Sequence, residues 1–521
     1  MARNLPPGIT EPHFTAAVEA FRRAVGDKWV LTGEDEVAGY RDPFPILDPG
    51  HFAPSAVVLP ATVEEVQAVV EAADRHRVPL APISRGKNLG FGGPAPRLPG
   101  AAVLDLKRMN RILDVDDRLG YAVVEPGVTF IDLAAYLHEH GSRFRVDVPD
   151  LGWGSVLGNT LERGMGYTPY SDHFATQCGM EVVLPDGDVV RTGMGALPGS
   201  RTAQVYPYGY GPSYDGMFTQ SNFGVVTKMG LWLLPEPAGF RAYMITLPRE
   251  EDLAPFTEIL RPLRLDRTIS HVPSMRSLLL DAAAQGPRSA YFSGDGPVPG
   301  SVQRRIMADQ RIGMWNFYGA LYGTEAAMDA QWSVIRDAFS AIPGAGFHFA
   351  GEHDSPVLAA RAKIMAGRPN LETAGIFQWL DNAGHIDVAP MAPATGEDAL
   401  RLYELARDLY LEFGKDYMGN FIFGEREMHQ IHLMMFDTED AGDRARTLRL
   451  CEALIGRAAE HGYGAYRAHP AIMDRVAATY GFNDNALLRL SERIKDALDP
   501  NGVLAPGKQG IWPRALRATG H

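Results

Sequence analysis

Two amphipathic helices with capping residues at their start are the clearest pattern in the first quarter of the chain. Over residues 62–77, valines and alanines recur at helical spacing, and Thr62 with Glu65 forms a capping box. Residues 129–138 carry the same signal, with Asp132 closing the box. Short apolar runs that predict buried strands lie beside these helices, at residues 56–59, 101–106 and 121–124. This alternation of strand and helix predicts a mixed α/β domain.

The pattern of apolar positions changes near residue 240, and we place a domain boundary there. Before it, an Asp-Gly turn at 186–187 between apolar runs predicts a β-hairpin. After it, strands are predicted at 242–248, 374–390 and 417–423, and helices at 251–264, 325–341, 396–413 and 442–461. A last helix precedes a Gly/Pro-rich turn close to the C-terminus.

Composition and charge narrow the class of protein. The 521 residues include 55 glycines and 38 prolines, which at 45% hydrophobic content indicates many tight turns. The formal net charge of −13 argues against nucleic acid or an anionic membrane as a partner. No apolar run reaches the roughly 20 residues of a membrane-spanning helix, and the N-terminus lacks the apolar stretch of a signal peptide. The sequence predicts a soluble, cytoplasmic protein with several domains.

Two cysteines, Cys178 and Cys451, are too few for a disulfide framework or a Cys-based zinc site, and we predict no metal. The sequence contains no CxxCH motif, so it predicts no covalently attached c-type haem.

Four glycine-rich loops are the first candidates for binding chemistry, at residues 82–93, 152–160, 220–227 and 499–508. Closely spaced glycines let backbone amides approach a phosphate, although the first loop has neither the P-loop nor the Rossmann spacing. A single loop of this kind is more often a mobile surface turn. Four in one chain indicate a large, elongated, phosphate-bearing cofactor that touches several segments.

The order of these motifs resembles the vanillyl-alcohol oxidase and para-cresol methylhydroxylase flavoproteins, especially the bacterial eugenol-oxidase and 4-alkylphenol-oxidase branch. The resemblance runs nearly end to end. It is carried by SAVVLP with the first glycine loop, VDVPDLGWGSVLGNTLERGMGYTPY, GMEVVLPDGDVVRTGMGALP, FTQSNFGVVTKMGLWLLP, IGMWNFYGALYG, EREMHQIH and DPNGVLAPGKQGIWP.

The resemblance implies an α+β fold, with a two-part FAD-binding domain of the para-cresol methylhydroxylase type and a central α/β cap domain over the flavin. We expect the FAD-binding domain at residues 1–240, the cap domain at 241–467, and a C-terminal return to the FAD-binding domain at 468–521.

The resemblance also implies which residues hold FAD. His385 matches the histidine that the family's oxidases bond covalently to the flavin 8α-methyl group. The other implied contacts are Ser84, Arg85, Gly86, Lys87, Asn88, Leu89, Gly90, Gly92, Gly93, Gly154, Ser155, Gly158, Asn159, Glu162, Gly166, Gly224, Val225 and Lys508. A lysine at 508 is consistent with the need of a pyrophosphate for a nearby cation.

The family binds its substrate as a phenolate, and Tyr466 with Arg467 matches the pair that holds the phenolate oxygen. Ionising a phenol of pKa about 10 at pH 7 costs roughly 4 kcal/mol, which a buried guanidinium and a tyrosine hydroxyl can offset. A third tyrosine of this clamp is replaced by Phe91. Tyr167 matches another aromatic residue of the pocket. Without the resemblance, an adjacent Tyr-Arg pair would be read as structural.

Asp150 matches the active-site acid near flavin N5, where a carboxylate in an aromatic pocket can act as a base. Taken alone, an aspartate after proline is better read as an Asx-turn. Further substrate-pocket positions are Asp387, Thr373, Asn420 and Ile431, and the first three depart from the relatives. These departures concern substrate preference.

The resemblance therefore implies an FAD-dependent oxidase of para-substituted phenols that passes electrons to O₂ and forms a homodimer. The preferred phenol stays open, as does hydroxylation against dehydrogenation of alkyl chains. Three alternatives remain: a 4-alkylphenol dehydrogenase coupled to a cytochrome, a flavin oxidase of sugars or hydroxy acids, and a catalytically silent flavin-binding protein. Substrate-dependent bleaching of the flavin would exclude the silent protein.

Overall fold

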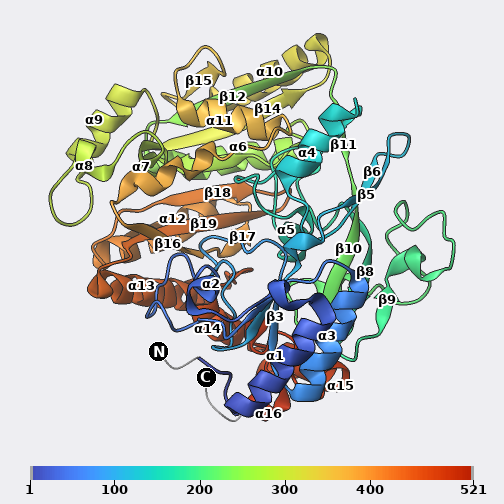
Figure 1. The fold of residues 1–521 in the computed structure, drawn as a ribbon. Helices are drawn as coiled ribbons and strands as arrows, with labels where there is room; N and C mark the ends of the chain where they lie inside the picture. The colour runs from blue at the N-terminus through green and yellow to red at the C-terminus, as the bar shows by residue number, and fades with distance from the viewer. Residues whose placement is uncertain (1–3, 518–521) are drawn as a thin grey trace.

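A computed structural model describes residues 4–517, and four β-sheets organise the chain (Figure 1). The first sheet has the order β1-β2-β4-β3, with β2, β4 and β3 parallel. Helices α1 (Glu11–Val25) and α3 (Val63–His76) pack on it through their buried alanine, valine and phenylalanine side chains. Its strands are β1 (Val30–Leu31), β2 (Val57–Val58), β3 (Leu80–Ile83) and β4 (Ala102–Asp105). The predicted helix at 62–77 and its Thr62 cap are confirmed.

The second sheet is antiparallel, in the order β5-β6-β10-β8-β9, and it includes the predicted hairpin as β8 and β9. The predicted helix at 129–138 is confirmed as α4 (Phe130–Glu139), with Thr129 and Asp132 forming the capping box. The strands are β5 (Ile112–Asp116), β6 (Tyr121–Val124), β8 (Gln177–Val183), β9 (Val189–Arg191) and β10 (Val225–Trp232). A separate two-stranded sheet pairs β7 (Phe144–Arg145) with β11 (Leu234–Pro235).

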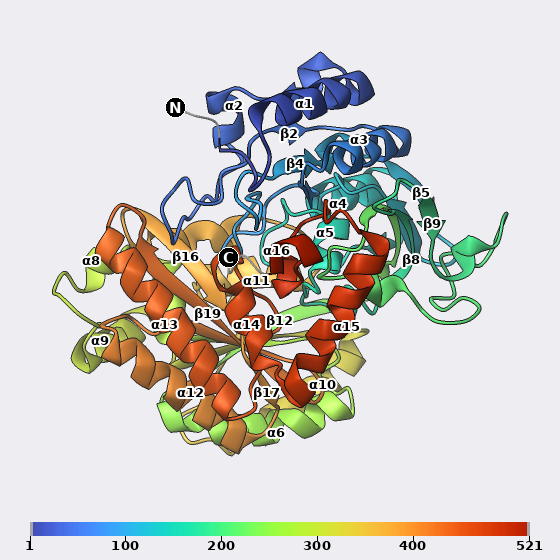
Figure 2. The same cartoon turned by 90° about the horizontal axis from the view of Figure 1, so that it is seen from below.

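The largest sheet has eight strands, all from the middle of the sequence, in the order β15-β12-β14-β13-β18-β19-β16 with β17 paired to β19. Helices α6, α10, α12 and α13 contribute to the cover of one face, and Figure 2 shows α12 and α13 side by side there. The strands are β12 (Phe240–Leu247), β13 (Ser274–Ser277), β14 (Trp315–Tyr322), β15 (Gly346–Phe349), β16 (Ala383–Val388), β17 (Met391–Pro393), β18 (Gly419–Phe423) and β19 (Glu427–Asp437). The helices are α6 (Leu253–Leu265), α10 (Glu325–Phe339), α12 (Gly396–Glu412) and α13 (Ala441–Glu460).

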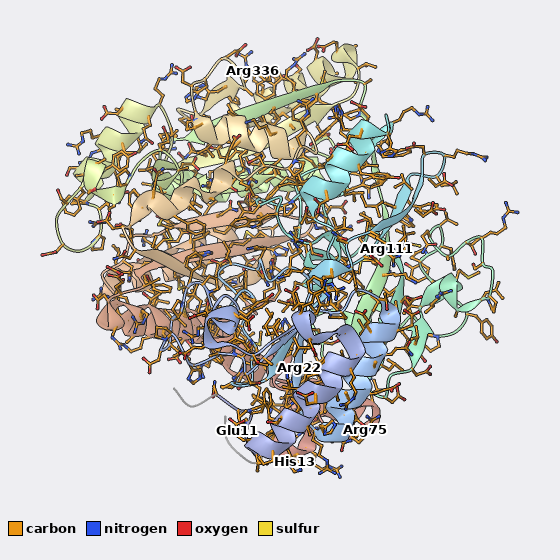
Figure 3. All side chains as sticks on the ribbon, viewed as in Figure 1. Glu11, His13, Arg22, Arg75, Arg111 and Arg336 are labelled. Atoms are coloured by element: carbon orange, nitrogen blue, oxygen red, sulfur yellow. The ribbon has the colours of Figure 1, made fainter. Side chains whose placement is uncertain are left out.

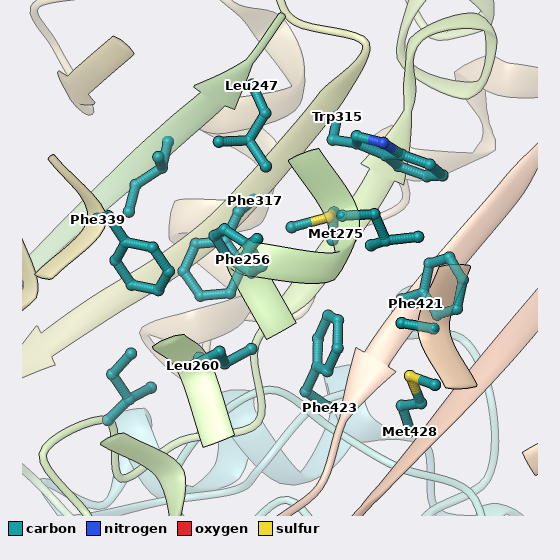
Figure 4. Packing of buried hydrophobic residues seen from close by; sticks show 14 of the residues in the cluster. Leu247, Phe256, Leu260, Met275, Trp315, Phe317, Phe339, Phe421, Phe423 and Met428 are labelled. Carbon is teal, nitrogen blue, oxygen red and sulfur yellow. The ribbon is translucent and has the colours of Figure 1, made fainter. Parts of the chain in front are cut away.

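Side chains of this sheet alternate between two cores, as the period of two along a strand requires. Ile245 and Leu247 pack with Phe256 and Phe317 beneath the covering helices (Figure 4). Met244, from the opposite face of β12, packs with α4 and with α11 (Pro356–Met365). The second core therefore joins the central sheet to the N-terminal part of the chain.

The C-terminal segment returns to the first sheet. After α14 (Met473–Thr479) and α15 (Phe482–Leu498), the Leu80 amide donates to the Val503 carbonyl and the Ala505 amide to the Leu80 carbonyl, each at 2.7 Å. Fully buried Lys495 donates to Asp499 and to the Leu504 carbonyl, which holds this return in place. The division of the chain into domains at residues 240 and 467 stays a prediction.

One predicted element is wrong. Residues 374–390 were expected to be strands, but Glu372–Trp379 forms a 3-10 helix and the strand begins at Ala383. Ile376 and Trp379 are buried on this short helix. In a short apolar run, the hydrophobic pattern alone does not distinguish a buried strand from a buried helical segment.

The remaining helices are short or lie at the edges of the molecule. They are α2 (Glu34–Ala38), α5 (Val156–Leu161), α7 (Leu278–Ala283), α8 (Arg288–Tyr291), α9 (Gly300–Gln310) and α16 (Arg514–Arg517). Charged side chains such as Arg75 and Arg336 extend from α3 and α10 at the outside of the molecule (Figure 3). Within residues 4–517, no helix is long and apolar enough to cross a bilayer.

Two buried histidines are expected to make the fold sensitive to acid. Burial lowers the pKa of His271 and of His432 from 6.5 to about 3. Between these values the unfolded chain binds more protons, so the stability is fully present above pH 6.5 and falls toward pH 3. Each histidine accounts for a loss of about 1.4 kcal/mol per pH unit in this window.

Thermal unfolding at pH 7 and pH 5 checks this expectation with the variant His432→Phe. Neither ring nitrogen of His432 has a hydrogen-bond partner among the described residues, so phenylalanine removes no hydrogen bond. The variant should lose less stability between the two pH values than the wild type does. An equal loss in both proteins would contradict the assignment to His432.

Candidate functional site

The glycine-rich loops come from distant parts of the chain and line one cavity of about 240 Å³. The first loop follows β3 at the edge of the first sheet, and the second surrounds Ser155 at the start of α5. Segments before β10, at residues 467–473 and after α15 also contribute to the lining. The loops are brought together because the C-terminal segment pairs with β3.

The first loop takes a shape that its glycines permit. Gly86, Gly90, Gly92 and Gly93 all have positive φ, between +56° and +86°. Side chains other than hydrogen are strained in this region of backbone space. At Gly92 a Cβ would also lie 2.7 Å from Pro470, so the loop is packed closely against the C-terminal segment.

Most of the predicted FAD residues line this one cavity. They are Ser84, Arg85, Gly86, Lys87, Asn88, Gly93, Gly154, Ser155, Gly158, Asn159, Glu162, Gly224, Val225 and Lys508. Leu89, Gly90, Gly92 and Gly166 lie outside the lining. Gly166 sits instead against the Asp147 carboxylate, with no room for a Cβ.

Charged side chains at the cavity are held by partners on other segments. Lys508 Nζ forms an ion pair with Glu162, so the C-terminal lysine is tied to the end of α5. Arg97, which the sequence analysis missed, lines the cavity and pairs with Asp474 at 2.6 Å. Nothing local distinguishes Arg97 in the sequence, because its partner lies 377 residues away.

Two amides of the third loop, Gln220 and Asn222, also line the cavity and were not singled out individually. The Gln220 amide donates to the carbonyl oxygens of Glu162 and Tyr466, and the Asn222 amide to those of Ala505 and Ile511. Both side chains therefore join segments of the cavity wall.

Arg467 and Phe91 stand together in the wall of the same cavity. The guanidinium carbon of Arg467 lies 4.1 Å from the centre of the Phe91 ring, and its Nη2 donates to Asn88 at 2.7 Å. Arg467 Nε is buried without a hydrogen-bond partner among the described residues. Tyr466 is half-buried, and its ring packs edge-on against His429 with the centres 4.8 Å apart. A guanidinium with an unused donor is suited to an anionic ligand.

A second cluster surrounds Asp150. The Tyr167 hydroxyl donates to Asp150 Oδ2 at 2.7 Å, and Arg361 donates to Asp150 Oδ1. The Arg361 guanidinium lies 3.8 Å above the centre of the Tyr167 ring. The Asp150 backbone carbonyl accepts a hydrogen bond from the Thr373 hydroxyl at 2.6 Å. Tyr167 and Thr373 therefore both contact Asp150, and all three are predicted site residues.

Burial and charge shape the proton equilibria of this cluster. Burial, followed by the Asp150 charge, raises the pKa of Tyr167, so its hydroxyl stays protonated and donates. Burial disfavours the charged form of Arg361, but Asp150 and Tyr167 outweigh that effect and raise its pKa. The side chain of Asp150 is 43% exposed, whereas that of Arg361 is 1% exposed. The carboxylate can therefore reach a ligand or water while its cation is sealed inside.

The sequence analysis missed Arg361. It lies on α11 among Val357, Leu358 and Ile364, and its neighbours give no signal for a buried cation. The helix itself was not predicted, and its buried positions lie around most of its circumference, so its pattern does not mark Arg361 as a buried cation.

His385 and Asp387 form a third cluster on β16. His385 Nδ1 and Asp387 Oδ1 are 2.8 Å apart, and both residues are buried. Neither lines the cavity. They lie behind Gly90, where a Cβ would be 2.6 Å from His385 Cε1 and 2.7 Å from Asp387 Oδ2.

The last two predicted pocket residues are neighbours across β18 and β19, where Asn420 pairs with Ile431. Asn420 is buried, and its Oδ1 has no hydrogen-bond partner among the described residues. Neither residue lines the cavity.

Comparisons with known proteins agree with this architecture. Residues 54–193 match the family model described as FAD binding domain, and residues 320–509 match FAD linked oxidases, C-terminal domain. The flavoprotein subunit of the hydroxylating 4-cresol dehydrogenase of Pseudomonas putida is 39% identical over 512 residues, covering 97% of each chain.

Two solved structures are similar over the whole chain. The 4-ethylphenol oxidase from Gulosibacter chungangensis, in complex with isoeugenol, has a TM-score of 0.97 at 43% identity and covers 98% of this chain and 100% of its own. p-Cresol methylhydroxylase with substrate bound has a TM-score of 0.95 at 38% identity, covering 98% and 99%. The α+β fold with an FAD-binding part and a central cap sheet is therefore confirmed.

Proposed function

Because the chain belongs to the para-cresol methylhydroxylase and vanillyl-alcohol oxidase family of FAD-dependent oxidoreductases, we propose that it oxidises para-substituted phenols. The substrates are 4-alkylphenols, 4-allylphenols and 4-hydroxybenzylic alcohols. A hydride leaves the benzylic carbon, the phenolic compound becomes a para-quinone methide, and O₂ is reduced to H₂O₂. The observation that carries this proposal is that Arg467 lines the same cavity as the glycine loops.

The residues of the cavity fit FAD. The first two loops approach closely enough that a Cβ on Gly158 would lie 2.1 Å from Ser84 Oγ, so bare backbone faces the cavity there. Exposed amides of such loops suit a pyrophosphate, and Lys508 provides a cation within the lining. Bound FAD supplies the hydride acceptor, flavin N5.

Arg467 and Tyr466 hold the phenol oxygen and favour its ionised form. Arg467 Nε, which has no hydrogen-bond partner among the described residues, is available to donate to the charge that develops on this oxygen. A phenolate pushes electron density toward the para carbon, which makes loss of a hydride easier. Phe91 beside the guanidinium adds an apolar ring to that part of the cavity wall.

Asp150 acts as the base of the reaction. Its carboxylate takes a proton either from the water that adds to the quinone methide or from the alkyl chain. The first route gives a benzylic alcohol and the second an alkenylphenol. Tyr167 and Arg361 orient the carboxylate through its two oxygens.

Dioxygen is the proposed electron acceptor, with transfer to a cytochrome subunit as the alternative. The histidine at 385, which matches the attachment residue of the family's oxidases, supports the oxidase. We further propose that His385 carries FAD through its 8α-methyl carbon.

A panel of para-substituted phenols, assayed for H₂O₂ and for identified products, tests the proposal. One H₂O₂ is expected for each two-electron oxidation. Rapid anaerobic reduction followed by slow reaction with O₂ would favour the cytochrome-coupled alternative. A flavin spectrum that no phenol bleaches would leave a flavin-binding protein without this activity.

Phe91→Tyr is expected to strengthen phenolate binding. The added hydroxyl would lie beside Arg467 and donate a further hydrogen bond to the phenolate, for a gain of at most about 1.5–3 kcal/mol. The pKa of the bound phenol would fall, so activity should extend to lower pH. The dissociation constant and the rate of flavin reduction against pH check this. Weaker binding of methoxylated phenols with an unchanged pH profile would show that Phe91 packs on a ring substituent instead.

We also propose that the protein is a homodimer. The segment 193–212 exposes Tyr206, Tyr208 and Tyr210, which are aromatic side chains suited to an interface between two chains. Light scattering should give about twice the 56.9 kDa mass of the chain. A mass of eight chains would refute the dimer.

A further inference from the structure

We propose that Asp387 is the positioning residue that prepares His385 for covalent attachment of FAD, and that it is not a substrate contact. This inference rests on the proposed function, which makes His385 the attachment point. The sequence placed Asp387 in the substrate pocket because it departs from the relatives there. Its contacts in the structure point to the histidine instead.

Asp387 and His385 are fixed to each other by the strand that carries them. Residues two apart on β16 share one face, so both side chains point the same way. Asp387 Oδ1 lies 2.8 Å from His385 Nδ1, and its side chain is 10% exposed. The Asp387 amide donates to the Gly90 carbonyl at 3.1 Å, which ties β16 to the first glycine loop.

This contact decides which tautomer of His385 is present. A carboxylate oxygen accepts hydrogen bonds, so the proton of the neutral imidazole lies on Nδ1 and the lone pair on Nε2. Nε2 is buried, and no described residue forms a hydrogen bond to it. A buried nitrogen with an unused lone pair can act as a nucleophile toward a bound ligand.

The surroundings leave His385 little freedom to rotate. The rings of Phe44 and Phe377 lie on it, with centres 5.2 and 5.0 Å from the imidazole centre. Gly90, in its left-handed conformation at φ +76°, packs against the imidazole and the carboxylate together. Its neighbours Asn88 and Phe91 line the cavity, so the pair lies directly behind the loop that faces the flavin.

The attachment step balances with His385 neutral at its start. Nε2 forms a bond to the 8α-methyl carbon, which loses one hydrogen as a proton to solvent. The electron pair of that C–H bond passes to the flavin ring system, and O₂ reoxidises the reduced ring to yield H₂O₂. The imidazole keeps its Nδ1 proton and becomes an imidazolium, whose positive charge the Asp387 carboxylate stabilises. An aspartate that orients a histidine and stabilises its cation has the same two tasks in serine proteases.

The test uses full-length chains expressed in riboflavin-depleted cells and mixed with FAD. Flavin that remains with acid-denatured protein is measured against time at several FAD concentrations. In Asp387→Asn, which keeps the shape and removes the charge, the limiting rate constant should fall at least tenfold. The half-saturating FAD concentration should stay within twofold. His385→Ala should bind FAD and attach none, and Asp381→Asn, at an exposed position of the same segment, should match the wild type.

Three results would overturn the proposal. One is attachment in Asp387→Asn at the wild-type rate. The second is loss of FAD binding in Asp387→Asn while His385→Ala still binds it, which would assign Asp387 to the binding site itself. The third is an Asp387→Asn variant that attaches flavin normally but no longer saturates with phenol, which would return Asp387 to the substrate pocket. A wild-type protein that attaches no flavin would instead refute the covalent link in the proposed function, whatever Asp387 does.

Discussion

Arg467→Ala is expected to slow reduction of the flavin by para-substituted phenols about 10²- to 10³-fold at pH 7. Ionising the phenol at this pH costs roughly 4 kcal/mol, which corresponds to about three powers of ten in the population of phenolate. Arg467 is a cation in the cavity wall, stacked on Phe91, with a donor that no residue described in the structure uses. Removing it leaves Tyr466 alone to favour the ionised form, so most of that population should be lost.

Single-turnover reduction of the flavin against pH measures the effect. The variant should regain rate as the pH rises toward the pKa of the free phenol, because solvent then ionises the substrate. Arg467→Lys keeps a charge but not the forked donor, and it should lie between the two proteins. Arg336→Ala, at an exposed position on α10, is the matched control. An Arg467→Ala variant with the pH profile of the wild type would show that the phenolate is held elsewhere.

Asp150→Ala is expected to reduce both activity and stability, and Arg361→Met in the same chain should restore only stability. Removing the carboxylate leaves the Arg361 guanidinium buried with Ser274 and the Tyr167 ring as its neighbours. Breaking a buried pair in this way costs about 3–5 kcal/mol, and the partial exposure of Asp150 places the expected loss near 3 kcal/mol. Loss of a general base slows catalysis by about 10²–10⁴-fold.

The double variant separates the two effects. Methionine fills much of the arginine's space without a charge, so most of the lost stability should return, whereas the rate of product formation stays low without the carboxylate. Thermal unfolding and single-turnover kinetics of the wild type, Asp150→Ala, Arg361→Met and the double variant complete the cycle. If the double variant is no more stable than Asp150→Ala, the unpaired Arg361 charge is not what destabilises Asp150→Ala.

Capping residues and hydrophobic spacing predicted the helices well. They did not predict which side chains of the candidate site contact one another. Thr62 and Thr129 were correctly predicted to cap helices, because a capping residue and the helix it begins are adjacent in the sequence. Asp387 was assigned to the substrate pocket because the resemblance made it a position that departs from the relatives. With the strand beginning at Ala383, the two-residue spacing from His385 puts both on one face.

The contact between Arg361 and Asp150 could not be predicted from a single sequence. Asp150 lies 211 residues before Arg361, and the two meet because one core joins α4, α11 and the central sheet. No periodicity of α11 carries that information, since buried positions occur around most of this helix. The residues proposed to hold FAD come from the resemblance, which supplied them position by position.

The return of residues 503–505 to β3 sets the order in which the protein can be completed during synthesis. β3 is an edge strand of its sheet, and an unpaired edge invites pairing with other chains. About 420 residues separate Leu80 from Leu504, so at 5–20 residues per second the ribosome needs roughly 20–85 s to deliver the strand's partner. The strands of the first sheet are therefore synthesised early, but the edge at β3 is covered only when residues 503–505 arrive. A nascent chain stalled before Lys495 would expose this edge to chaperones or to aggregation.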